Sequence, residues 1–159
     1  MDKIERAIDD IRRKWAPDGR LAVFEISLLP KGVGGVTSSR DARGELIAAG
    51  HGSDGKFVDS LQYLAAGGAP LGDPKRLNRN TTLAVIATNA DLDRVQLQAL
   101  AQSGSDALAR RITPYGSLFD GDVIFAVSTA AVQPKSAMQV DAIAALVVPE
   151  AVERAVRRG

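Results

Sequence analysis

The chain is organised around the stretch Arg79-Asn80-Thr81-Thr82-Leu83-Ala84-Val85-Ile86-Ala87-Thr88. A polar approach ends at Asn80, and a continuous apolar run follows at once. Such a run at strand length is typical of a strand that is covered on both faces. A threonine at the mouth of this strand, directly after an asparagine, makes Thr81 the best candidate for a chemical centre. Threonine also starts strands well, so a purely structural role is the alternative.

Upstream of this stretch, hydrophobic spacing predicts an amphipathic helix over residues 2–15. Its apolar face is formed by Ile4, Ala7, Ile8, Ile11 and Trp15, with charged residues opposite. A strand is expected over 21–29, a short strand over 45–49 and a short helix over 57–65. Residues 66–80 are expected to form a loop, because they contain glycines, prolines and asparagines and no apolar period.

Downstream, Asp91 is expected to cap a helix that runs to about Arg111. A second buried strand is predicted over 123–128, and a helix over 139–148. Pro149 either kinks that helix or begins a last helix over 150–158. Strands that alternate with helices of this length predict an α/β sandwich, and 159 residues favour a single domain.

Composition excludes several classes of function. A formal net charge of +1 gives no sign of nucleic acid or an anionic membrane as a partner. With no cysteine, the chain has no disulfide, thiolate metal site or cysteine nucleophile. No apolar run approaches the ~18 residues of a membrane-spanning helix, and the charged start lacks the apolar core of a signal peptide. We therefore expect a cytoplasmic protein.

Three other polar features each have a structural interpretation beside a functional one. Lys31 stands in a glycine-rich loop that matches neither a Walker A loop nor a dinucleotide fingerprint. The single histidine, His51, lies between two glycines and is more often a solvated loop residue than a catalyst. Asp120 and Asp122 flank one glycine, which is typical of a turn. The alternative is a carboxylate pair that orients an amine or a hydroxyl.

A hydroxyl becomes a nucleophile only when a base takes its proton, and no histidine lies near Thr81 in the sequence. Cleavage of the Asn80–Thr81 bond would supply a base, because the new α-amine would sit on the same residue. An α-amine has a reference pKa of ~8, close to working pH. This N-terminal-nucleophile chemistry needs no metal and no organic cofactor.

Two motifs resemble a known family. The stretch Asn80–Leu92 is similar to the cleavage-site signature of the L-aminopeptidase/D-esterase family. That family includes β-aminopeptidases and the endo-type 6-aminohexanoate-oligomer hydrolase. The stretch Phe119–Thr129 resembles the family's second signature at a matching separation, and Ala151–Val156 resembles its C-terminal helix. The similarity is strong over 80–159, and the paired motifs are specific.

The resemblance implies a precursor that cuts itself into two subunits, which stay together in an αββα sandwich. By position, Asn80–Thr81 is the scissile bond and Thr81 the nucleophile. Asp120 and Asp122 correspond to the acidic pair that positions its hydroxyl and amine. Residues 1–80 then form a shortened counterpart of the first subunit, and 81–159 form the nucleophile-bearing second subunit. We therefore expect the sandwich to be incomplete.

The first half matches the family less well. The stretch Lys31–Arg40 is similar to the family's Lys-Gly-Gly-x-Gly-Thr-x-Ser element, with the glycines shifted, which makes Lys31 a match for the family's site lysine. Gly50 stands where the family places a functional asparagine. Loss of such a donor costs ~10²–10³ in rate. Residues 1–28 resemble nothing in the family.

The resemblance favours an amide hydrolase, either an aminopeptidase or an amino-acid-oligomer hydrolase. Its substrate would be a peptide or an amino-acid amide, and we expect a homo-oligomer. The first alternative is an inactive, shortened relative that serves as a structural or subunit-interaction module. A third interpretation is an N-acetyltransferase of the glutamate N-acetyltransferase kind, which shares the self-cleaving threonine.

Overall fold

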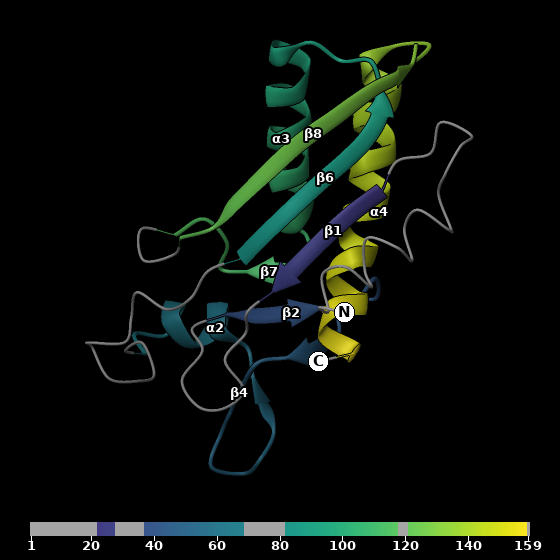
Figure 1. The fold of residues 1–159 in the computed structure, drawn as a ribbon. Coiled ribbons are helices and arrows are strands. Elements are labelled where there is room, and N and C mark those ends of the chain that lie inside the picture. Colours follow the sequence, from purple (N-terminus) through teal and green to yellow (C-terminus); the bar gives the residue numbers. More distant parts are fainter. Residues whose placement is uncertain (1–21, 28–36, 69–81, 118–120, 159) are drawn as a thin grey trace.

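The computed structural model describes residues 22–27, 37–68, 82–117 and 121–158, of which 22–27 and 158 are described by their backbone alone. Figure 1 shows their arrangement. In chain order the elements are β1 (Ala22–Ser27), β2 (Ser38–Arg40), β3 (Leu46–Ala48), β4 (Gly50–His51), β5 (Phe57–Val58), α2 (Ser60–Ala65), β6 (Thr82–Ala90), α3 (Arg94–Leu108), β7 (Ile112–Thr113), β8 (Val123–Val132) and α4 (Ala137–Arg158). The predicted α/β class is confirmed.

The main sheet has the strand order β1-β6-β8 (Figure 1). Strand β1 runs antiparallel to β6, with Ile26 opposite Leu83. Strand β8 runs parallel to β6, with Leu83 opposite Val123. The two apolar runs of the sequence are thus neighbouring strands. Because they are parallel and in register, the residues that precede them meet at one edge of the sheet.

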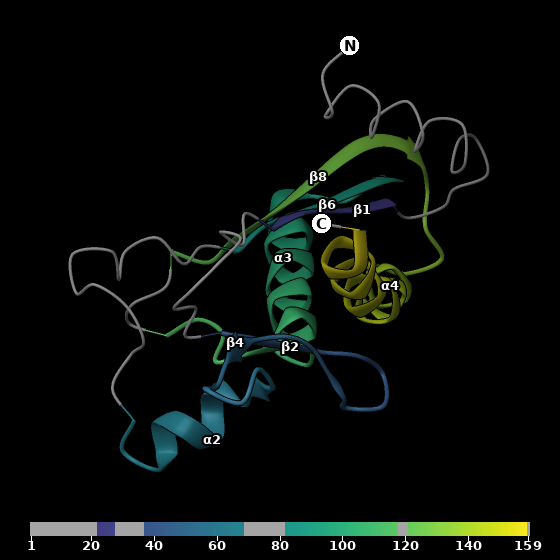
Figure 2. The ribbon, with the colours of Figure 1, turned by 90° about the horizontal axis from the view of Figure 1, so that it is seen from below.

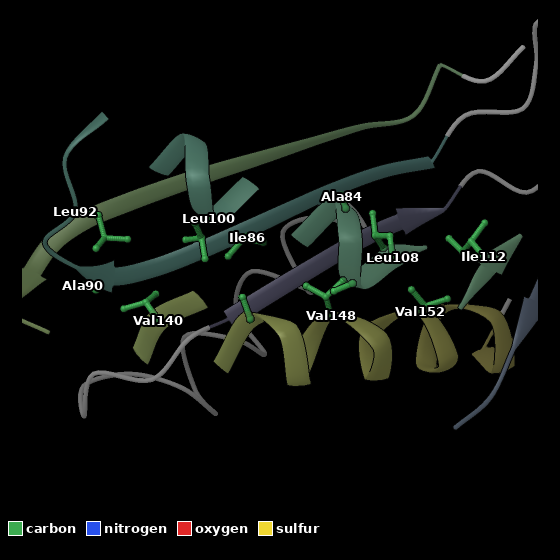
Figure 3. Packing of buried hydrophobic residues seen from close by; sticks show 12 residues of the cluster. Ala84, Ile86, Ala90, Leu92, Leu100, Leu108, Ile112, Val140, Val148 and Val152 are labelled. Atoms are coloured by element: carbon green, nitrogen blue, oxygen red, sulfur yellow. The ribbon is translucent and has the colours of Figure 1, made fainter. Parts of the chain in front are cut away.

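Helices α3 and α4 cover one face of this sheet (Figure 2). Alternate residues of β6 are buried on that side, among them Ala84 and Ile86. Gly104 of α3 lies directly over the sheet, since a Cβ built there would come within 2.5 Å of Ile86 Cδ1. Figure 3 shows the resulting core. Its buried members are Ala84, Ile86, Ala90, Leu92, Leu100, Ala107, Leu108, Ile112, Val140, Ala144, Val148 and Val152.

The other face of the same sheet has no described helix or strand packed on it (Figure 2). Its side chains from β6 are half-buried and those from β8 are exposed, with Phe125 at 55% and Val127 at 49%. We call this surface the open face; it consists of Leu83, Val85, Ala87, Val123, Phe125 and Val127. The apolar run over 82–88 predicted cover on both faces, and the described residues provide it on one only.

A second, three-stranded sheet has the order β3-β2-β7 and lies across the helices from the main sheet (Figure 2). Two ion pairs help to hold it to its surroundings. Arg111, just before β7, donates from Nε to Glu153 of α4 at 2.9 Å. Asp41, just after β2, accepts from Arg157 of α4 at 3.4 Å. Strands β4 and β5 form a separate two-stranded sheet.

Several element boundaries differ from those predicted. Helix α3 begins at Arg94, because Asp93 and Gln96 form a capping box; Asp91, the expected cap, instead accepts from Gln133 at 2.6 Å. The predicted helix over 57–65 divides into β5 and α2, since Asp59 caps α2 through the amides of Leu61 and Gln62.

Two further predictions concern helices near the ends of the chain. The prediction that Pro149 begins a last helix is wrong, because a single helix, α4, continues through it to Arg158. The expected helix over 2–15 lies outside the described residues. No helix in the described part of the chain is long and apolar enough to cross a membrane.

Candidate active site

The predicted site lies at the edge of the main sheet where β6 and β8 begin. Four of its proposed members, Lys31, Asn80, Thr81 and Asp120, fall outside the described residues. Asp122, two residues after Asp120 in the sequence, and Thr82, the residue after Thr81, are described. The geometry of the site is therefore built from Asp122 and the groups that contact it.

Asp122 is joined to the residue after the proposed nucleophile. The backbone N–H of Thr82 donates to Asp122 Oδ1 at 2.6 Å, although the two residues are 40 positions apart in the chain. Thr82 itself is buried, with 8% of its surface exposed. The parallel register of Leu83 with Val123 explains the contact, because it places positions 82 and 122 side by side at the strand mouths. A charged acceptor makes this a stronger hydrogen bond than a neutral backbone pair.

The second oxygen of Asp122 is held as well. The backbone N–H of Gly116 donates to Asp122 Oδ2 at 2.9 Å. Gly116 has φ +64°, in the left-handed region that favours glycine. With each oxygen fixed by a different amide, the carboxylate cannot rotate away from the mouth of β6.

The loop that presents Gly116 is itself anchored. Tyr115 packs against the hydrophobic core, and its hydroxyl oxygen accepts from Ser105 Oγ of α3 at 3.3 Å. Residue type gave no signal for this contact, because a backbone amide that holds a carboxylate cannot be distinguished in the sequence from any other.

His51 and Gly50 lie in a different sheet from the strands next to Asp122. Gly50 pairs with Val58 and His51 with Phe57 in the β4–β5 ladder. The exposed His51 ring packs on Phe57 with centroids 4.9 Å apart. A strand residue packed on an aromatic ring fits the structural interpretation of His51 better than a catalytic one.

Ser38 and Ser60 form a buried hydroxyl pair. Ser38, fully buried, donates to Ser60 Oγ at 2.8 Å and accepts from the Ser60 N–H at 2.9 Å. The neighbouring Arg40 and Asp59 form an ion pair. These mutual contacts join β2 to the start of α2, so the pair is explained by structure. Within the described ranges, no three His, Asp or Glu side chains gather closely enough to hold a metal ion.

Residues 32–159 match peptidase family S58. An uncharacterized aminopeptidase of Mycobacterium leprae is 44% identical over 54 residues, which are 34% of this chain and 15% of that protein. Uncharacterized aminopeptidases of Mycobacterium bovis and Mycobacterium tuberculosis are 43% identical over 53 residues, again 15% of their length. The aligned segment thus spans a small part of each relative.

Proposed function

Because the chain belongs to peptidase family S58, the L-aminopeptidase/D-esterase family that its motifs resemble, we propose that it is a self-processing amide hydrolase with Thr81 as its N-terminal nucleophile. One observation carries the proposal. The Asp122 carboxylate, from the second signature motif, accepts the N–H of Thr82 at 2.6 Å. An acidic group is thereby fixed one residue from the proposed nucleophile.

In the self-processing step, the Thr81 hydroxyl attacks the carbonyl carbon of Asn80. The Asn80–Thr81 C–N bond breaks, the acyl group passes to the hydroxyl oxygen as an ester, and the nitrogen takes up the proton. Water then hydrolyses the ester, which frees the Asn80 carboxylate and restores the hydroxyl. The products are residues 1–80 and a chain that begins with the α-amine of Thr81.

In the hydrolytic reaction, this α-amine takes the proton of the Thr81 hydroxyl as the oxygen attacks a substrate amide carbonyl. The substrate C–N bond breaks, its amine leaves with the proton, and an acyl ester remains on Thr81 until water hydrolyses it. Asp120 and Asp122 orient the amine and the hydroxyl, and Lys31 supplies positive charge beside the developing oxyanion. Substrates are peptides or amino-acid amides.

Intact mass after expression tests the first step directly. Wild type should give two masses that correspond to residues 1–80 and 81–159, and Thr81→Ala should stay whole. The matched control is Thr82→Ala, which keeps its backbone N–H and should still be cut before Thr81. The second step is tested by release of p-nitroaniline from aminoacyl p-nitroanilides. A wild-type chain that stays whole and releases no p-nitroaniline contradicts the proposal.

The rival function is a structural or subunit-interaction module without activity. The observation that favours it is the position of β8, which ends the strand order of the main sheet and pairs with no described strand on its outer edge. Such an edge can pair with a strand of another chain. An uncut, inactive chain that elutes as a stable oligomer would support this rival, whereas a cut and active homo-oligomer fits the main proposal.

A further inference from the structure

The outer side of helix α4 carries an apolar stripe that neither the core nor the candidate site uses. On the inner side of the helix, Val148 points into the core (Figure 3). On the outer side, Met138 is 78% and Leu146 is 74% exposed, with the exposed Ala142 between them and Ile143 beside them. Positions 138, 142 and 146 are spaced four residues apart, so they lie on one face of the helix. We call Met138, Ala142 and Leu146 the outer stripe.

The two halves of α4 differ in what surrounds them. In the C-terminal half, Glu153 and Arg157 form ion pairs with Arg111 and Asp41 beside the second sheet. The outer stripe lies in the other half, and its exposed fractions show that nothing in the described part of the chain covers it. Contiguous exposed apolar side chains are typical of an interaction surface. We propose that the outer stripes of two copies of the chain pack against each other, antiparallel, around a two-fold axis at Ala142.

The order of side chains along the outer stripe favours a second copy as the partner. A two-fold axis requires a surface that is its own complement. With the axis at Ala142, Met138 of each copy faces Leu146 of the other, and the two Ala142 methyl groups face each other. The small central residue lets the helix axes come within about 8–10 Å, and the larger residues fill the space on either side. The large-small-large order therefore complements itself.

The charges at the two ends of the outer stripe are complementary in the same arrangement. Lys135 lies seven positions before Ala142 and Glu150 lies eight positions after it, and both are exposed. An antiparallel pair therefore places each Lys135 level with Glu150 of the other copy, whereas a parallel pair would bring like charges together. Asp141 lies about 100° from Ala142 around the helix, on the opposite flank from Glu150. Exposed charge pairs of this kind select an orientation more than they add affinity.

The size of the surface sets the strength that we expect. The outer stripe is about 12 Å long from Met138 to Leu146, at 1.5 Å per residue. One pair of helices in contact over this length is a small interface, and small interfaces are typical of weak complexes. We therefore expect a monomer–dimer equilibrium with a dissociation constant on the order of micromolar.

Because the chain contains no cysteine, one introduced cysteine reports on the two-fold contact. Ala142→Cys should give a disulfide-linked dimer on mild oxidation, since the axis brings the two positions 142 within disulfide range. The matched control is Ala99→Cys, at an exposed alanine of α3. We expect the first variant to link about tenfold faster than the control, because the dimer raises the local concentration of its thiols. Equal rates would overturn the proposal.

The cross-linking result does not depend on the proposed function. If the chain cuts itself before Thr81, the disulfide of Ala142→Cys joins two copies of residues 81–159. If it does not, the disulfide joins two whole chains. Intact mass distinguishes the two products, and either one supports the two-fold contact.

Sedimentation at several protein concentrations measures the equilibrium without a cross-link. Leu146→Asp should raise the dissociation constant by about thirtyfold, because it puts a charge into the centre of the contact. Val95→Asp, at an apolar position of α3 that is 75% exposed, is the matched control and should leave the constant unchanged. Lys135→Glu should weaken the dimer by about threefold at low salt, and Glu150→Lys in the same chain should restore it.

Three outcomes of the sedimentation experiment would contradict the proposal. The first is a wild-type chain that stays monomeric far above micromolar concentration. The second is a dimer that responds equally to Leu146→Asp and Val95→Asp. The third is a dimer that tolerates Leu146→Asp, which would mean that the copies meet elsewhere, as at the outer edge of β8 or on the open face.

Discussion

The two ends of β6 perform the same structural task with different chemistry. At the far end, the Asp91 N–H donates to the Val132 carbonyl at 2.7 Å and Ser128 Oγ donates to the Ala90 carbonyl, and just beyond both strands the exposed Asp91 carboxylate accepts from the Gln133 side chain at 2.6 Å. At the mouth, the junction is a carboxylate, Asp122, held by two backbone amides. Both ends therefore carry a carboxylate, but they hold it differently. Asp91 is exposed and accepts from one side chain, whereas each oxygen of the half-buried Asp122 accepts from a backbone amide. This fixed orientation of Asp122 is what favours a chemical role at the mouth.

Replacement of the charged junction should have the largest effect. Asp122→Ala removes the acceptor of the Thr82 and Gly116 amides, and we expect self-cleavage to slow by about 10²–10³, the usual loss for one preorganised polar partner. The rate is measured by intact mass over time. Asp122→Asn, which keeps one acceptor oxygen without the charge, separates position from charge. Cleavage at the wild-type rate in both variants would mean that the two ends of β6 are equivalent.

Disturbance of the amide that holds Asp122 should have a smaller effect. Gly116→Val places a β-branched residue at φ +64°, at a cost of about 1–2 kcal/mol, and should slow cleavage as the loop shifts. Gly116→Asn should be nearly neutral, because asparagine tolerates this conformation. Thermal unfolding and cleavage rate are measured together. If both variants behave as wild type, the Gly116 hydrogen bond has no positioning role.

Removal of the neutral junction should affect stability alone. Ser128→Ala deletes the hydroxyl that donates to the Ala90 carbonyl and accepts from the Ala130 N–H at 2.9 Å. We expect a loss of about 0.5–1.5 kcal/mol in the free energy of unfolding. The cleavage rate of folded protein should stay as in wild type. A large fall in the cleavage rate would show that cleavage depends on the end of β6 near Ala90 and not on the mouth of the strand.

Asp41 offers the smallest effect and a useful contrast with Asp122, because it also accepts two backbone amides, from Arg43 at 2.9 Å and Glu45 at 3.0 Å. Burial raises the pKa of its carboxyl, but these amides and the Arg157 guanidinium together hold that pKa below its usual value. With its folded pKa below its unfolded value, Asp41 adds stability above about pH 3.9 that is lost as the pH falls through the folded pKa.

The corresponding experiment compares wild type with Asp41→Asn in urea at several pH values. Wild type should be slightly more stable near neutral pH, and the difference should vanish under acid. Cleavage should proceed normally in Asp41→Asn, because this carboxylate lies far along the chain from either strand mouth. Loss of cleavage in Asp41→Asn would show that a carboxylate bound by backbone amides affects cleavage by stabilising the whole fold.

The sequence predicted the framework well where a single physical pattern dominates. The apolar runs gave β6 and β8, and the 3.6-residue period gave α3 and α4. Boundaries failed where local hydrogen bonds decide: Asp93 and Asp91 are the same residue type, and only the partner at Gln96 selects the cap. The contact of Thr82 with Asp122 depends on the parallel register of β6 and β8, and the role of Gly116 rests on a backbone amide and on φ, so residue types alone predicted neither.

The central position of β6 has a consequence for any cut before Thr81. Strand β1 lies upstream of the cut and β8 lies downstream, yet both pair with β6 in one sheet. The nicked protein would be a complex whose two polypeptides share a hydrogen-bonded ladder, and it would elute from a sizing column unchanged. Only a denaturing method would separate the fragments. For the same reason, residues 1–80 and 81–159 expressed as two separate chains should associate and form the same sheet.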